Sequence, residues 1–169
     1  FKMKNLIKLF ILTIALSLGA CNSPERSVGF ATGEGPNGTD LSKLQFHLGT
    51  QETVDIVTDL DKLWAAGDWE AMRPYFSDTF QYNKPDGTQL NSFDEFVESN
   101  TSGPEVTWTY NNAFSVDLAP DMGGELVHAN FTITYPETGV SHEQHEMYYI
   151  VQGQIMGIWQ YKMDIIDQE

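Results

Sequence analysis

The chain has 169 residues and a formal net charge of −15, from 24 acidic against nine basic residues, and 41% of its residues are hydrophobic. This length and composition are typical of a single globular domain and exclude fibrous and low-complexity classes. The excess of acid excludes a nucleic-acid partner, because binding to a phosphate backbone depends on lysine and arginine. The single cysteine, Cys21, excludes internal disulfides and paired-cysteine zinc motifs.

The N-terminal segment is basic and then apolar. Three lysines accompany the start of the apolar run 9–18, and no acidic residue appears before Glu25. A membrane span needs about 20 apolar residues, so this shorter run predicts a cleaved signal peptide over residues 1–20. The tetrapeptide Leu-Gly-Ala-Cys that ends at Cys21 resembles the bacterial lipobox. The resemblance implies that Cys21 is lipidated and anchors the protein to a membrane of the bacterial cell envelope, periplasmic or surface-facing.

Residues 21–50 are predicted to be the lipidated cysteine and a flexible tether. Glycine, proline, asparagine and serine are frequent there, and apolar periodicity is weak. Gly33-x-Gly35-x-x-Gly38 matches the dinucleotide-binding fingerprint in its letters, but no strand precedes it and Pro36 predicts a turn where a helix would have to begin. We therefore expect no nucleotide, and the sequence indicates no other cofactor.

The folded domain is predicted to begin near residue 51 with a helical hairpin. Apolar residues recur at helical spacing over 54–66, which indicates an amphipathic helix. Gly67 ends that helix, and Asp68 is a suitable N-cap for a second, short helix that Pro74 ends.

A short strand and a third helix are expected next. The strand covers 79–83 and leads into a turn at 84–87, where proline, aspartate and glycine follow one another. Ser92 then caps a helix, and Glu95, three residues later, completes a capping box.

From residue 106 onward the apolar pattern has a period of two, which indicates strands. The side chains of Trp108, Tyr110 and Asn112 are expected to share one face, and Glu146 is expected to share a face with Tyr148. The expected strands begin at 106 and continue over 126–135, 141–151 and 154–165. Helices followed by a long antiparallel sheet predict the α+β class, with the helices on one face.

Four motifs stand out within residues 51–169. They are 63–70 (LWAAGDWE), 75–80 (YFSDTF), 85–87 (PDG) and 152–155 (QGQI), the last followed by Trp159, Tyr161 and Asp164. Their order and spacing resemble the nuclear transport factor 2-like superfamily, which includes SnoaL-like polyketide cyclases and ketosteroid isomerases. The resemblance implies a cone in which three N-terminal helices pack on a curved antiparallel sheet around a pocket. Because this fold hosts enzymes, binders and dimerisation modules, it does not specify a function.

The resemblance allows the chemistry of ketosteroid isomerases to be compared by position. It places the general base at Lys84, the oxyanion-donating tyrosine at Leu60 and a third, acidic group at Glu146. Loss of one oxyanion donor costs about 10²-fold or more in rate, so the leucine argues against this chemistry. SnoaL-like cyclases also keep an acid at the position of Glu146, and often a histidine where this chain has Ile158.

Aromatic residues are the other candidates for a site. Most of them are expected in the core, and the remainder would give the pocket an apolar wall. The candidate ligand-binding residues are Leu60, Trp64, Tyr82, Phe96, Trp108, Tyr110, Tyr148 and Ile158. Lys84 and Glu146 are the candidate polar or catalytic pair, and they are expected to meet across the pocket, unless Lys84 points into solvent from its turn.

No metal site is predicted. His142 and His145 lie in a stretch that resembles a zinc motif, but residues three apart on a strand point to opposite faces. His128 is interpreted as an ordinary strand histidine.

These observations favour an exported, lipid-anchored domain that binds a small apolar or amphipathic molecule without catalysis. One alternative is a SnoaL-like or isomerase-like enzyme that uses Glu146 as an acid/base, and another is a dimerising module without a ligand. We also expect a homodimer that forms through the outer face of the sheet. The candidate interface residues are Tyr149, Trp159, Tyr161 and Met163.

Overall fold

A computed structural model describes residues 28–29, 40, 45–119 and 123–164, and the fold is described for these residues. In chain order the elements are β1 (Val28–Gly29), β2 (Gln45–Leu48), α2 (Gln51–Ala66), α3 (Trp69–Met72), the 3₁₀ helix η2 (Arg73–Tyr75), β3 (Phe76–Asn83), β4 (Gln89–Leu90), α4 (Phe93–Thr101), β5 (Thr107–Ala119), β6 (Gly124–Thr134), β7 (Ser141–Val151) and β8 (Gln154–Asp164). None of the helices in this part of the chain is long and apolar enough to cross a membrane. The expected signal peptide and Cys21 lie outside the described residues.

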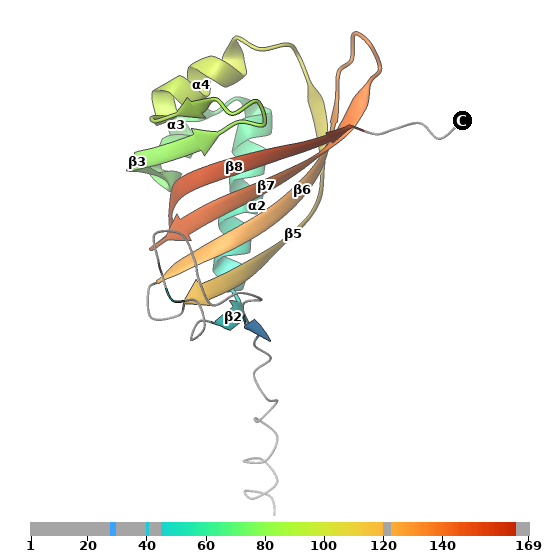
Figure 1. The fold of residues 1–169 in the computed structure, drawn as a ribbon. Helices are drawn as coiled ribbons and strands as arrows, with labels where there is room; N and C mark the ends of the chain where they lie inside the picture. The colour runs from blue at the N-terminus through green and yellow to red at the C-terminus, as the bar shows by residue number, and fades with distance from the viewer. Residues whose placement is uncertain (1–27, 30–39, 41–44, 120–122, 165–169) are drawn as a thin grey trace, which may run out of the picture.

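The long strands curve around α2, while α3, α4 and β3 lie at the end of the sheet away from β2 (Figure 1). Within the described residues the strand order is β1-β2-β5-β6-β7-β8-β3-β4. The three helices cover the concave face, so the predicted α+β cone is confirmed. One pairing differs from the expected antiparallel sheet, because β3 runs parallel to β8. No hairpin joins these two strands, so no tight turn imposes an antiparallel direction on them.

Local capping explains where the helices begin and end. Thr50 caps α2 by accepting a hydrogen bond from the Thr53 N–H, so the helix begins three residues before the expected position 54. Its first turn is polar, and apolar periodicity alone therefore misses it. Gly67, at φ 67°, ends the helix in the left-handed conformation that favours glycine. The caps predicted at Asp68 and Ser92 are confirmed, since both side chains accept backbone N–H groups of the following helix.

A β-bulge changes the expected faces of β5. The register between β5 and β6 shifts between Tyr110 and Asn112. Because an extra residue reverses the alternation beyond it, Asn112 turns to the outer face, where its Oδ1 accepts a hydrogen bond from Asn130 at 2.8 Å. The expectation that Asn112 shares a face with Trp108 is therefore wrong.

The stretch expected to be tether contains a strand at its end. β2 pairs with β5 through His47 opposite Asp117 and Leu48 opposite Val116. Strand pairing uses backbone groups and needs no apolar periodicity, so this short strand left little signal in the sequence.

The core lies between the helices and the concave face of the sheet. Phe96 of α4 is fully buried at its centre, with its ring centroid 4.9 Å from that of Trp64 and 5.0 Å from that of Tyr82. The buried apolar residues are Val57, Leu60, Met72, Phe76, Phe80, Tyr82, Phe93, Phe96, Val127, Ala129, Phe131, Ile133, Tyr148, Ile150, Ile155 and Ile158. This core borders a cavity through Tyr82, Phe131, Ile133 and Tyr148.

Candidate ligand-binding cavity

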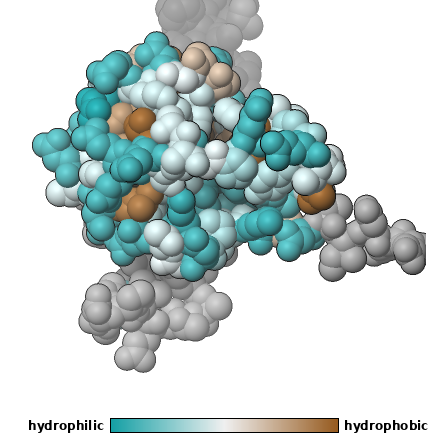
Figure 2. Space-filling view, turned by 90° about the horizontal axis from the view of Figure 1, so that it is seen from above, coloured by the Kyte–Doolittle hydropathy of each residue, from teal (hydrophilic) through white to brown (hydrophobic). Residues whose placement is uncertain are grey.

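A cavity of about 840 Å³ lies between the helices and the concave face, at the end of the cone that carries α3 and α4. Its lining comes from the end of α2, the turn after β3, the loop after α4 and the inner faces of β5 to β8. Seen from this end, most of the surface is hydrophilic or intermediate, and hydrophobic residues show only in small separate areas (Figure 2). The volume suits a small molecule, since ligand sites of this kind occupy about 300–1,000 Å³.

Glu146 forms the polar floor of the cavity and is only 3% exposed. Its Oε2 accepts the hydroxyl of Tyr148, and its Oε1 accepts the amides of Gln144 and Gln160, each at 2.6 Å. Two of these donors sit two residues away on β7, and the third is directly opposite on β8. The prediction that Glu146 and Tyr148 share a face is therefore confirmed.

The surroundings of Glu146 favour its neutral form. Burial raises the pKa of this carboxyl above its ordinary value, and the three neutral donors only partly oppose that rise. The negative charge of Asp61 on α2 raises it further. Burial and the neighbouring Glu146 also raise the pKa of Tyr148 well above its usual range, so this phenol remains a hydrogen-bond donor.

Lys84 lines the same cavity but does not form the expected ion pair with Glu146. No ion pair among the described residues joins these two side chains. Lys84 directly follows Asn83, which pairs with Trp159, and Glu146 is opposite Gln160. The two residues are therefore level with one another, but β8 lies between their strands. The charge of Lys84 contributes instead to a lowered pKa of Asp86, whose main cause is hydrogen bonding from Thr88.

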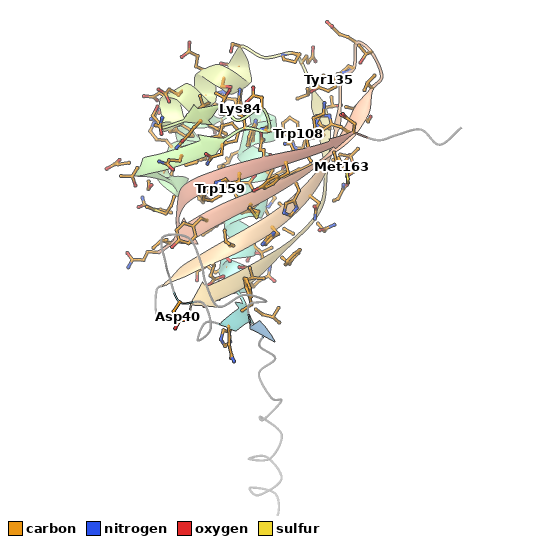
Figure 3. The ribbon with its side chains drawn as sticks, viewed as in Figure 1. Asp40, Lys84, Trp108, Tyr135, Trp159 and Met163 are labelled. Carbon is orange, nitrogen blue, oxygen red and sulfur yellow. The ribbon has the colours of Figure 1, made fainter. Side chains whose placement is uncertain are left out.

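Aromatic side chains form the walls. Trp64, Tyr82, Trp108 and Tyr148, all expected to bind a ligand, line the cavity together. Trp108 lies at the same end of the molecule as Lys84 and Tyr135 (Figure 3).

The indole N–H of Trp108 donates to the Asp61 carboxylate at 2.8 Å. This contact joins β5 to α2 and fixes the orientation of the ring. Nothing in the sequence pattern joins these two residues, which are 47 positions apart.

The structure does not bring the other four candidates to the cavity. Leu60, Phe96 and Ile158 are fully buried in the core. Tyr110 lies beside Phe131, with ring centroids 5.3 Å apart, and its hydroxyl is 3.3 Å from that of Thr58. Packing from neighbouring elements covers these side chains.

His142 is a polar lining residue that the sequence analysis considered only as a zinc ligand. It is 3% exposed, and its Nδ1 has no hydrogen-bond partner in the described part of the chain. Alternation along β7 places it on the face of Glu146, and this signal could have identified it. His145 lies on the outer face, with its Nε2 3.1 Å from Nδ1 of His128, so the predicted separation of His142 and His145 is confirmed. Among the described residues no group of three or more possible metal ligands is found.

Comparison with known proteins identifies the fold through structure alone. No protein-family model matches the sequence, and a search of curated proteins finds no match either. A proposed ketosteroid isomerase from Kribbella flavida superposes with a TM-score of 0.59 at 11% identity, covering 71% of this chain and 84% of its own. An NTF2-like protein of unknown function from Burkholderia xenovorans reaches 0.55 at 15% identity, covering 70% and 88%.

A third solved structure, the CaMKII hub of S. rosetta, has a TM-score of 0.55 at 14% identity and covers 67% of this chain and 95% of its own. At these identities the likeness concerns the fold. It confirms the architecture that the sequence motifs implied.

Proposed function

We propose that this chain, which has the nuclear transport factor 2-like fold, binds a small apolar or amphipathic molecule in its cavity without changing it chemically. The observation that carries the proposal is a cavity of about 840 Å³ with aromatic walls and a single buried carboxyl at its floor. Both oxygens of that carboxyl already accept hydrogen bonds from neutral side chains. The residues at the base and oxyanion positions of the isomerases, Lys84 and Leu60, also support binding over catalysis.

A saturable titration with the uncharged dye Nile red tests this proposal. Ala66 lines the cavity, so Ala66→Trp fills part of it and is expected to weaken binding about tenfold or more. Ala71→Trp is the matched control, because Ala71 is exposed on α3 outside the cavity. Equal binding by both variants, or no saturable binding by the wild-type chain, contradicts the proposal.

The raised pKa of Glu146 favours one alternative, in which its protonated carboxyl acts as an acid on a bound substrate. The fate of the molecule that co-purifies with the chain distinguishes binding alone from catalysis. Its recovery unchanged after prolonged incubation supports binding alone. Conversion to a product by the wild-type chain, but not by Glu146→Gln, supports the enzyme.

The proposed role includes attachment to a membrane of the bacterial cell envelope through lipidated Cys21. The support is the lipobox resemblance at residues outside the described part of the chain. Cys21→Ser is expected to abolish membrane association and leave the circular dichroism of the domain unchanged, because the anchor lies outside the core. A variant that still sediments with membranes contradicts the attachment.

The proposed assembly is a homodimer through the outer face of the sheet. Trp159 and Met163 lie along β8 (Figure 3), and Tyr161 and Met163 are 54% and 68% exposed. The ring of Trp159 lies against Gly157, which has no side chain to lift it from the sheet. Tyr161→Glu is expected to convert the dimer to a monomer in sedimentation at micromolar concentration. A wild-type chain that sediments as a monomer contradicts the assembly.

A further inference from the structure

Two tryptophans form a corner in the cavity wall. The ring centroids of Trp64 and Trp108 lie 6.3 Å apart, with 63° between the ring planes. Trp69 stands in the same relation to Trp64, at 6.3 Å and 63°. Both rings line the cavity, and a cation is attracted to an aromatic ring within about 6 Å of its centroid, so a cation placed between them reaches both.

Asp61 places a carboxylate at this corner. It lies three residues before Trp64 on α2, which puts both side chains on one side of the helix, and it accepts the indole N–H of Trp108. Among the described ion pairs, none includes Asp61. Its neighbour Lys62 is bound to Asp59 at 2.7 Å and is not part of the cavity lining.

The basic residues of the lining do not neutralise this charge. Lys162 is paired with Asp164 at 3.1 Å, and the charge of Lys84 acts on Asp86. The negative charge of Asp61 reaches the floor, where it raises the pKa of Glu146. The chain as a whole carries −15, so a positively charged ligand is attracted both at long range and inside the cavity.

We infer that the molecule held in this cavity is an organic cation, whose alkylammonium group lies in the corner of Trp64 and Trp108 beside the Asp61 carboxylate. The inference rests on the proposed binding function and adds the chemical class of the ligand. The cation gains two aromatic rings and one carboxylate that belongs to none of the described ion pairs. The unpartnered Nδ1 of His142 is available to a polar group elsewhere on the same molecule.

A charge series of one molecular shape tests the inference with the full-length chain. Choline, 3,3-dimethylbutan-1-ol and 3,3-dimethylbutanoate share a branched head of the same size and differ in charge. Binding is followed through the indole N–H signals of Trp64 and Trp108 in NMR titrations. Choline is expected to bind at least tenfold more tightly than the alcohol, and the anion most weakly.

The outcomes separate this inference from the function on which it rests. If the alcohol binds as tightly as choline, or the anion binds best, the cation assignment is overturned while binding in the cavity stands. If none of the three binds and Nile red does not bind either, both are overturned.

Two variants test the role of the carboxylate. Asp61→Asn keeps an acceptor for the Trp108 indole but removes the charge, so choline binding is expected to weaken about tenfold with binding of the alcohol unchanged. Glu52→Gln on the same helix, outside the lining, is expected to leave both unchanged. An equal loss for choline and the alcohol in Asp61→Asn marks a structural role and overturns the assignment.

Discussion

Two glutamates on neighbouring strands accept similar sets of hydrogen bonds, yet their pKa values shift in opposite directions. Glu125 of β6 accepts the backbone N–H and hydroxyl of Thr50 and the hydroxyls of Thr53 and Ser115. Glu146 of β7 accepts one hydroxyl and two amides. Burial pushes both pKa values up, but at Glu125 the hydrogen bonds outweigh it and the pKa is lowered, whereas at Glu146 burial prevails.

The difference shows that exposure, more than the number of donors, decides the direction in which the pKa values of these carboxyls shift. Glu125 is partly exposed and lies at the N-terminus of α2, where the helix dipole also favours an anion. It attaches the start of the helix to the sheet. Glu146 is closed in by the core, and there burial raises its pKa above the ordinary value despite three donors.

The largest expected effect is on the attachment of α2. Glu125→Gln removes the charge that four donors share, so we expect a loss of about 1–2 kcal/mol in the free energy of unfolding at neutral pH. Urea denaturation measures it. Glu137→Gln, in the exposed turn between β6 and β7, is the control and is expected to change stability by less than about 0.5 kcal/mol. Equal stability of the two variants would show that this cluster does not hold the helix.

The second expected effect is an opposite pH dependence. Because its pKa is lowered in the folded state, Glu125 stabilises the fold above the ordinary pKa of glutamate. This stabilisation is lost as the pH falls through the pKa of Glu125 in the folded state. The loss of stability caused by Glu125→Gln therefore becomes smaller in acid. Because its pKa is raised in the folded state, Glu146 contributes its full stabilisation below the ordinary pKa of glutamate. This stabilisation is lost as the pH rises through the pKa of Glu146 in the folded state. Relative to wild type, Glu146→Gln therefore gains stability as the pH rises.

Urea denaturation of both variants between about pH 4 and 8 measures these two slopes. Glu146→Gln removes the titrating group, so its stability relative to wild type reports the pKa shift of Glu146. Slopes of the same sign in the two variants would refute the comparison.

The smallest expected effects come from single donors. Tyr148→Phe and Ser115→Ala each remove one hydrogen bond that lowers a pKa, so the pKa of Glu146 and that of Glu125 are both expected to rise. Carbon-13 NMR titration of the side-chain carboxyls measures both, with Tyr149→Phe on the outer face of β7 as the control. An unchanged pKa of Glu146 in Tyr148→Phe would show that its hydroxyl does not bind the carboxyl.

Features that depend on neighbouring residues of the same helix or strand were predictable from the sequence. Strand alternation placed Glu146 with Tyr148, and side-chain capping located Asp68 and Ser92 at helix starts. The orientation of Asn112 was not predictable, because its bulge exists only in the pairing of β5 with β6.

The site was predictable only in part, since its remaining contacts depend on register and packing. Gln160 reaches Glu146 because of the β7–β8 register, and Asp61 meets Trp108 through the docking of α2 on the sheet. Leu60 and Phe96 carry the same apolar signal as true lining residues. Only the packing of neighbouring elements shows that they belong to the core.

Native mass spectrometry of the purified full-length chain tests the binding of a small molecule most directly, because it reports a bound ligand and the oligomeric state together. The account predicts one small organic molecule per chain in the wild type, lost or strongly reduced in Ala66→Trp and retained in Ala71→Trp. A wild-type chain that carries no such molecule and acquires none when Nile red is added would contradict it.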